Sequence, residues 1–182
     1  MQNNWSQEKY IEAYRFAAEK HKNQLFPGTD WSYVVHLSVV SMEIIASFNH
    51  EPDVNGDLAV QAAILHDTIE DTDTTYEELQ SKFGQKIAAG VLSLTKDLGI
   101  KKQDRMSDSL SRIKAQPKEI WMVKFADRIT NLQPPPAYWD NEKKKQYLKQ
   151  SQLIYDELRN ASEYLSKRLE KKILDYRTYI DR

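Results

Sequence analysis

The sequence of 182 residues predicts an all-α fold, and three observations support this prediction. Apolar residues recur at spacings of three and four in several segments, as on the buried face of a helix. Segment 141–179 contains neither proline nor glycine and carries an apolar stripe. The length lies within the usual range of one domain. We therefore expect one compact helical bundle over residues 1–182, with a core at about 8–132 and a long C-terminal helical segment at about 141–180.

The first expected helix follows Ser6, whose hydroxyl suits the N-cap position. Pro27 and Gly28 interrupt the chain after it, because proline and glycine disfavour a continuing helix. His21 lies near the end of this helix, and we expect it to be structural or exposed rather than a metal ligand. The inner face of the helix comprises Tyr10, Ala13, Tyr14 and Ala17.

Two further helices carry the most apolar part of the chain. The first spans residues 33–48 and ends near Asn49. A turn follows, and we expect Asp57 to cap the next helix. That helix is apolar almost all round, which predicts a buried element that continues through Asp71. Its core stripe comprises Leu58, Ala62, Leu65 and Ile69.

Turn and capping signals predict the remaining helices. Segment 74–78 resembles a capping box, which begins a short helix that Gly84 ends. The polar stretch 96–118 is expected to hold one helix at about 108–115. The three prolines at 134–136 end a preceding helix sharply, since proline cannot continue it. We expect the other helices at residues 85–95 and 120–132.

Segment 66–71 places one imidazole and three carboxylates within less than two helical turns that are otherwise apolar. His66 lies four residues before Glu70, and Asp67 four before Asp71, so each pair shares a helix face. Such a density of charge is costly unless a cation lies among the side chains. A solvated, exposed helix end would need no metal, but this helix is too apolar for exposure.

Two other segments carry side chains that complement this cluster. His36 lies on the apolar helix 33–48, where a lone histidine is more often a hydrogen-bonded core residue than a ligand. A second histidine and several carboxylates reverse that interpretation. In segment 120–132, Lys124, Asp127 and Asn131 fall on one stripe, with Arg128 beside it. A solvated surface stripe is the alternative for Lys124 and Arg128, whereas apolar neighbours surround Asp127.

These segments together offer two imidazoles and two carboxylates, a mixed nitrogen and oxygen ligand set. The chain has no cysteine, which excludes a thiolate-rich zinc or iron–sulfur site. The set suits one divalent ion and fits Mn(II), Fe(II), Co(II) or Zn(II). Glu70 and Asp71 then remain to position or deprotonate the attacking water. The expected ligands are His36, His66, Asp67 and Asp127.

This ordered set of motifs resembles the HD-domain phosphohydrolases. Within them it is similar to the hydrolase domain of the RelA/SpoT alarmone enzymes and to the small single-domain alarmone hydrolases. The resemblance covers roughly residues 8–132 and is more specific than any single motif. The matching segments are YVVH at 33–36, AAILHDTIEDT at 62–72, FG at 83–84, VKFADR at 123–128 and Asn131.

The resemblance implies an all-helical HD fold with one Mn(II) held by the four expected ligands. It also implies that Glu70 and Asp71 serve the attacking water and that Asn131 contacts the nucleotide sugar. The family reaction removes pyrophosphate from the 3′ position of guanosine tetra- or pentaphosphate, which is the activity we expect. One alternative is an HD-class nucleotide phosphatase acting on NADPH or a nucleoside monophosphate. The other is a catalytically weak nucleotide-sensing module.

The chain departs from the alarmone hydrolases where they carry basic residues before the motif tyrosine. Leu25 and Phe26 stand at that place, so phosphate-binding cations must come from elsewhere. Lys124 and Arg128 are two candidates. Arg105 or Arg112 could also reach the mouth of the site and bind phosphate, although a charge run is more often a solvated face.

Composition limits the partners of this chain. Lys and Arg total 26 against 27 Asp and Glu, a net charge of −1, so no basic surplus favours nucleic acid. The N-terminus has no apolar signal core, and no segment approaches the length of a membrane span. We therefore expect a cytoplasmic enzyme with a small-molecule nucleotide substrate. The apolar stripe that runs from Leu158 to Ile173 favours packing on the same domain, and a homodimer is possible.

Overall fold

The computed structural model describes residues 5–180, and it confirms the all-α fold over that range. An antiparallel bridge between Leu25 and Ser32 closes a small hairpin. The helices in chain order are α1 (Gln7–Lys20), α2 (Val34–Ser47), α3 (Gly56–Leu65), α4 (Thr68–Asp71), α5 (Tyr76–Phe83), α6 (Gln85–Leu94), α7 (Arg105–Lys114), α8 (Lys118–Asn131), α9 (Asn141–Leu158), α10 (Glu163–Tyr176) and the 3₁₀ turn η1 (Arg177–Tyr179).

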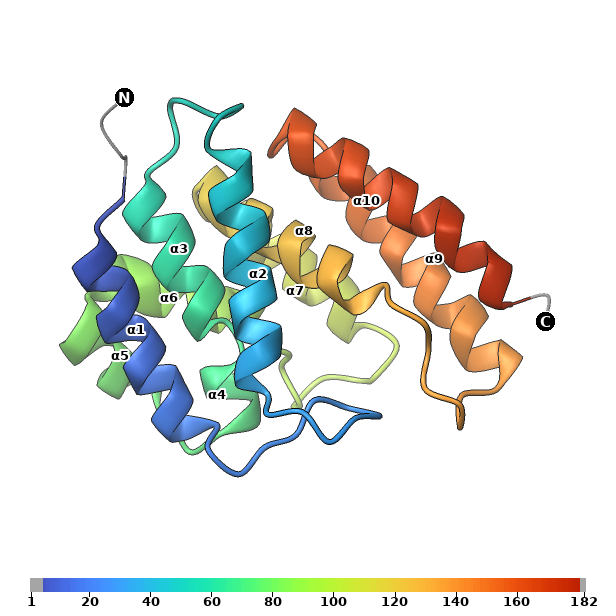
Figure 1. Ribbon diagram of the computed structural model, residues 1–182, viewed down its shortest axis with the longest axis horizontal. Coiled ribbons are helices and arrows are strands. Elements are labelled where there is room, and N and C mark those ends of the chain that lie inside the picture. Colours follow the sequence, from blue (N-terminus) through green and yellow to red (C-terminus); the bar gives the residue numbers. More distant parts are fainter. Residues whose placement is uncertain (1–4, 181–182) are drawn as a thin grey trace.

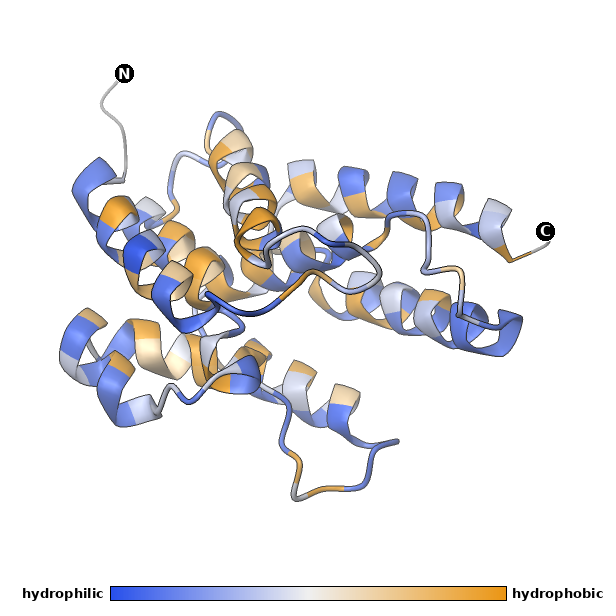
Figure 2. Cartoon of the chain, turned by 60° about the horizontal axis from the view of Figure 1, so that its bottom comes forward, coloured by the Kyte–Doolittle hydropathy of each residue, from blue (hydrophilic) through white to orange (hydrophobic). Residues whose placement is uncertain are grey.

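The central element is α3, which contacts α1, α2, α6 and α8 (Figure 1). All of its residues except Asp57 are buried, as its apolar sequence predicts. The inward faces of the helices are apolar and the outward faces are hydrophilic (Figure 2). This arrangement fixes α2, α3 and α8 against one another, and these are the helices that carry the charged motifs.

Side chains of three residues cap the N-termini of α1, α3 and α5. Ser6 accepts a hydrogen bond from the backbone N–H of Lys9, which confirms the expected cap of α1. Asp57 does not cap α3, which corrects our expectation. Asn55 takes that role and accepts from the N–H of Leu58 at 3.0 Å. Thr75 caps α5.

The Asp57 carboxylate instead joins α3 to the start of α1. One oxygen accepts from the Ser6 backbone N–H at 2.7 Å, and the other lies 2.5 Å from Lys9 Nζ. Asp57 lies inside α3, where its side chain no longer reaches the N–H groups that a cap serves.

The helix through the acidic motif is also interrupted, which corrects the expectation of one continuous element. The helix α3 ends at Leu65, and α4 begins at Thr68. The Thr68 hydroxyl donates to the Leu65 carbonyl at 2.7 Å and takes the acceptor that a continuing helix would use. Asp67 lies at the break with φ −101° and ψ 0°. The side chains of His66 and Asp67 are therefore placed by a bend and not by simple helical spacing.

The C-terminal segment forms the antiparallel pair α9 and α10, which packs on α8 (Figure 1). Its apolar stripe is buried in this packing, since Leu158, Leu165 and Leu169 have no exposed surface. The stripe is therefore not free to bind a second chain. Arg168 on α10 also pairs with the buried Glu43 of α2, with Nε 2.6 Å from Oε2. No helix within residues 5–180 is both long and apolar enough to span a membrane.

Candidate metal centre and catalytic cavity

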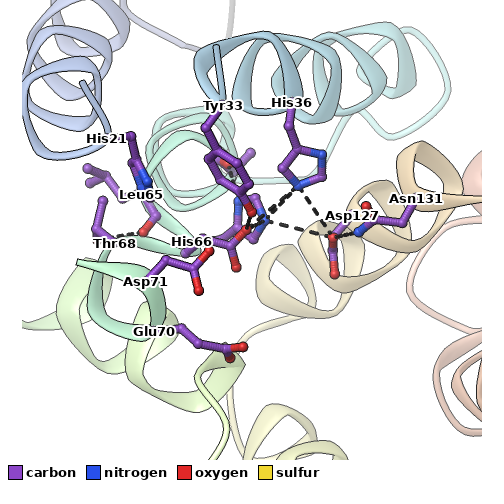
Figure 3. A network of polar contacts seen from close by, with 12 residues as sticks. His21, Tyr33, His36, Leu65, His66, Thr68, Glu70, Asp71, Asp127 and Asn131 are labelled. Atoms are coloured by element: carbon purple, nitrogen blue, oxygen red, sulfur yellow. Dashed lines mark hydrogen bonds and ion pairs between the residues drawn. The ribbon is translucent and has the colours of Figure 1, made fainter. Parts of the chain in front are cut away.

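The four expected ligands come together from three parts of the fold (Figure 3). His36 lies on the first turn of α2, His66 and Asp67 lie at the break between α3 and α4, and Asp127 lies on α8. Both histidines are almost fully buried, since only 2% of the surface of His36 and 3% of the surface of His66 is exposed. The expectation that these residues converge is therefore met by the fold.

The distances from each imidazole to the other donors of this cluster fit one shared ion. The two Nε2 atoms lie 3.3 Å apart, and Asp67 Oδ2 lies 2.8 Å from His66 Nε2 and 3.7 Å from His36 Nε2. Asp127 Oδ1 lies 3.6 and 3.8 Å from the two imidazole nitrogens. Ligand bonds of about 2.0–2.2 Å allow two donors on one ion to be at most about 4.4 Å apart. Every one of these pairs satisfies that limit.

Neighbouring groups orient the donors. His66 Nδ1 lies 2.8 Å from the Ala63 carbonyl, which can only accept, so Nδ1 carries a proton and Nε2 faces the cluster. The Tyr33 hydroxyl donates to Asp67 Oδ2. Burial and the charge of Asp67 raise the pKa of Tyr33 far above its usual range, so it remains a donor. These contacts are typical of the groups that hold metal ligands in place.

The Asp127 carboxylate is held from its own helix. Asn131 Nδ2 donates to Oδ1, and Lys124 Nζ lies 3.1 Å from Oδ2. The three side chains therefore share the stripe of α8 that their spacing predicts. Burial opposes ionisation of Asp127, but Lys124 and His66 outweigh it and lower the pKa of this carboxyl. Asp127 is consequently ionised and available as an anionic ligand.

The two imidazoles differ in their protonation. Burial and the neighbouring His66 lower the pKa of His36 to about 4. Burial acts in the same direction on His66, but the carboxylates of Asp67 and Asp127 outweigh it and raise that pKa to about 9. In the absence of an ion, the cluster therefore holds a proton on His66. A divalent ion would replace this proton, since a metal ligand must be deprotonated.

The two carboxylates of the expected catalytic pair lie on α4 and face the same cavity (Figure 3). Both oxygens of Glu70 are bound by Lys96, one through the backbone N–H at 2.9 Å and one through Nζ. Asp71 Oδ2 accepts from Gln24 Nε2 at 2.9 Å. Burial, with the charges of Asp67 and Glu70, raises the pKa of Asp71. A raised pKa suits a carboxylate that accepts a proton.

A cavity of about 420 Å³ opens beside the cluster and is large enough for a nucleotide. It is lined by Asp67, Glu70, Asp71 and Asp127 and by five cationic side chains. Its remaining walls include apolar and amide side chains from α6, α7 and α9. The cationic residues are Lys96, Lys102, Arg105, Lys124 and Arg128.

The two arginines proposed for the mouth of the site have different roles. Arg105 lines the cavity and is braced by the carbonyls of Leu98 and Ile100, both at 3.2 Å. Arg112 does not line it, which corrects our expectation. Its guanidinium caps the end of α6 by donating to three carbonyls, including those of Leu92 and Thr95 at 2.8 Å, and it also binds Asp108. Arginine reaches exposed carbonyls at a helix C-terminus readily, and this explains its position.

Arg128 is the most enclosed cation of the cavity, with 5% of the residue exposed. Its guanidinium lies 4.2 Å from the centre of the Tyr147 ring on α9, and Nη1 lies 3.5 Å from the Ser151 hydroxyl. The alternative of a solvated surface stripe is therefore wrong for Arg128. A cation over an aromatic face is stabilised without a carboxylate, which leaves its charge available to an anion.

Several residues of the cavity were not found by sequence reasoning. Tyr33 entered only as part of a motif, and Lys96 only as part of a charge run. The helix α9 was assigned to packing alone, yet Gln146, Tyr147 and Gln150 line the cavity. Tyr147 and Gln150 follow Gln146 by one and four residues, so the three side chains lie on one side of the helix. Without the fold, this spacing does not indicate a function.

Buried donors for one ion, an acidic pair and a cationic cavity define the class of metal-dependent phosphohydrolases. A family model described as "HD domain" matches residues 13–164 of the chain. The chain therefore belongs to the HD domain family, and the expectation of an HD-class hydrolase related to the small alarmone hydrolases is confirmed.

Two named relatives and one solved structure are similar to this chain over most of its length. The guanosine-3′,5′-bis(diphosphate) 3′-pyrophosphohydrolase MESH1 of Danio rerio is 30% identical over 169 residues, which cover 91% of this chain and 92% of that protein. The guanosine-3′,5′-bis(diphosphate) 3′-pyrophosphohydrolase of Aquifex aeolicus is 32% identical over 81% of this chain and 20% of that protein. A solved structure described as "a metazoan ortholog of SpoT" that "hydrolyzes ppGpp" superposes with a TM-score of 0.80 at 27% identity and covers 96% of this chain and 98% of that one.

Proposed function

We propose that this chain is a Mn(II)-dependent 3′-pyrophosphohydrolase of guanosine 3′,5′-bispyrophosphate, acting in the cytoplasm. The observation that carries the proposal is one cavity that is lined by three of the four donors, by the acidic pair and by five cations. The similarity to MESH1 over nearly the whole of both chains supports the choice of substrate. Cations on several walls suit a ligand that carries phosphates at two positions.

The reaction transfers the 3′-pyrophosphoryl group to water. The water oxygen forms a bond to the phosphorus attached to the 3′ oxygen, and the bond between that phosphorus and the 3′ oxygen breaks. The 3′ oxygen is the leaving group and takes up a proton to give guanosine diphosphate, and the pyrophosphate released carries the oxygen of the attacking water. When bound by His36, His66, Asp67 and Asp127, the divalent ion supplies positive charge that favours ionisation of water and polarises the phosphoryl oxygens.

The protein side chains have separate tasks in this proposal. Asp71, whose pKa is raised, accepts the proton of the attacking water. Glu70, held by Lys96, orients that water. Lys124, Arg105 and Arg128 bind phosphate oxygens, and Asn131 contacts the sugar. Cations placed before the reaction stabilise the charge that develops on the transferred group.

The experiment strips the protein of metal, restores Mn(II) and screens guanosine tetraphosphate, NADPH, and nucleoside mono-, di- and triphosphates. We expect equimolar guanosine diphosphate and pyrophosphate from the tetraphosphate, and no turnover after Asp71→Asn. The exposed Asp156→Asn on α9 is the matched control and should keep full activity. Phosphate release from NADPH or monophosphates alone would replace the proposal by a nucleotide phosphatase. Tight nucleotide binding without turnover would replace it by a sensing module.

A further inference from the structure

A chain of hydrogen bonds runs from the buried His21 through Gln24 to Asp71 of the acidic pair. His21 caps the end of α1 and has 1% of the residue exposed. Its Nδ1 lies 2.6 Å from Gln24 Oε1, and Gln24 Nε2 lies 2.9 Å from Asp71 Oδ2. The sequence pattern marks neither His21 nor Gln24 as functional. The structure nevertheless links them directly to the carboxylate that accepts a proton in the proposed reaction.

The chemistry of the groups fixes every proton in this chain. A carboxylate only accepts, so the amide nitrogen of Gln24 must face Asp71. The amide oxygen then faces His21, and His21 Nδ1 must carry the proton. Within residues 5–180, His21 Nε2 is buried without a hydrogen-bond partner. A neutral imidazole in the Nδ1–H tautomer satisfies this arrangement, because a charged ring would bury an unpaired N–H.

Packing and backbone contacts hold both residues in place. The His21 ring stacks on the Tyr33 ring, with centroids 4.9 Å apart and planes inclined by 24°. The Gln24 backbone donates to the His21 carbonyl and accepts from the Tyr33 N–H, both at 2.9 Å. The amide therefore meets Asp71 in a fixed position. Asp71 itself is the last residue of the four-residue helix α4.

We propose that His21 and Gln24 are positioning residues that aim Asp71 at the attacking water. His21 sets the orientation of the Gln24 amide, and the amide holds one carboxylate oxygen of Asp71 and leaves the other for the cavity. The inference rests on the proposed hydrolysis. Without His21, the amide is free to rotate and to turn its oxygen toward Asp71, which would repel the carboxylate.

Kinetics of four variants test this chain. Gln24→Met keeps the volume of the side chain, and His21→Phe keeps an aromatic ring, but each variant removes the hydrogen bonds of the residue it replaces. Each should lower kcat by about ten- to a hundredfold, the effect of losing a hydrogen bond to a charged group, with KM changed less than about twofold. The double variant should be no slower than the slower single variant. His21→Asn keeps a donor at the place of Nδ1 and should restore most of kcat. The exposed Asn23→Ala is the control.

Equal kcat in Gln24→Met and wild type would overturn the proposal, as would additive losses in the double variant or a failure of His21→Asn to restore kcat. Nitrogen NMR of the unmodified protein gives a readout that needs neither activity nor a variant that folds. We expect the His21 signals of the Nδ1–H tautomer, and an Nε2–H tautomer would overturn the chain. If the wild type does not hydrolyse the tetraphosphate, the proposed function fails, while the His21 tautomer still decides whether the hydrogen-bond chain exists.

Discussion

If the expected metal centre binds the proposed Mn(II), the stability of the fold should depend on that ion. Each of the two buried imidazoles lies 2.8–3.8 Å from the other imidazole and from the two carboxylates. An ion that binds this cluster only in the folded chain stabilises the fold by mass action. We therefore predict that adding Mn(II) to the metal-free protein raises its Tm.

The size of the shift follows from the length of the chain. Mn(II) at a hundred times its Kd stabilises the folded state by about 2.7 kcal/mol. An unfolding entropy of about 2.1 cal/mol/K per residue gives roughly 0.38 kcal/mol/K for 182 residues. The expected rise in Tm is therefore about 7 °C.

Thermal unfolding followed by circular dichroism, with and without MnCl₂ after chelator treatment, measures this shift. Asp127→Ala removes one donor and should reduce the rise to less than about 2 °C at the same Mn(II) concentration. Asp156→Ala removes an exposed carboxylate from α9 and should keep the full rise. An unchanged Tm in the wild type at every Mn(II) concentration, or an equal rise in Asp127→Ala, would refute the assignment of the ligands.

Three further predictions concern residues around the cavity. Lys96→Met should lower kcat for guanosine tetraphosphate about tenfold, because Glu70 loses the charged donor on one oxygen. Lys101→Met, in the same loop, is the control. An unchanged kcat in Lys96→Met would contradict the role of this contact. Asp57→Asn should remove stability near pH 7 but not at low pH. Hydrogen bonds from the start of α1 outweigh burial and lower the folded-state pKa of Asp57 below its ordinary value of 3.8, so its contribution is present above that value and lost as pH falls through the folded pKa. Urea unfolding across pH 2–7 measures the effect, and a difference from wild type that persists at pH 2 would contradict it. Arg112→Ala should destabilise the fold by about 1–3 kcal/mol through the uncapped carbonyls of α6 and leave KM unchanged, and a raised KM would return Arg112 to the substrate site.

The sequence predicts the helices from local patterns, and it predicts the convergence of the ligands because charged side chains on three apolar segments need one shared cation. The cap of α1 and the stripe that joins Lys124 to Asn131 each follow from spacing within one helix. The break before Thr68 does not follow from spacing, because one hydroxyl competes there with the backbone for a carbonyl. Asparagine and aspartate are comparable as N-cap residues, so only the exact start of the helix replaces the expected Asp57 by Asn55.

The residues that sequence reasoning missed depend on contacts between distant segments. Gln24 meets Asp71 across 47 positions, and Lys96 meets Glu70 across 26. No periodic pattern marks such pairs, because each partner lies in a loop or at a helix end, where the path of the chain is set by the whole fold. The same holds for α9, whose cavity face is polar and resembles any solvated helix face in sequence.

The cations of the cavity come from other segments than the hairpin before Tyr33, where the alarmone hydrolases carry basic residues. Leu25 is 56% exposed on the hairpin, and the neighbouring Phe26 ring stacks on His36 with centroids 5.4 Å apart. Neither side chain offers a charge. The cavity nevertheless carries five cations, supplied by α7, α8 and the loop that joins α6 to α7. Electrostatic attraction depends on distance and local dielectric and not on which segment bears the charge. With a divalent ion bound, positive charges outnumber the four carboxylates of the cavity, so a polyphosphate is attracted although the hairpin contributes no basic residue.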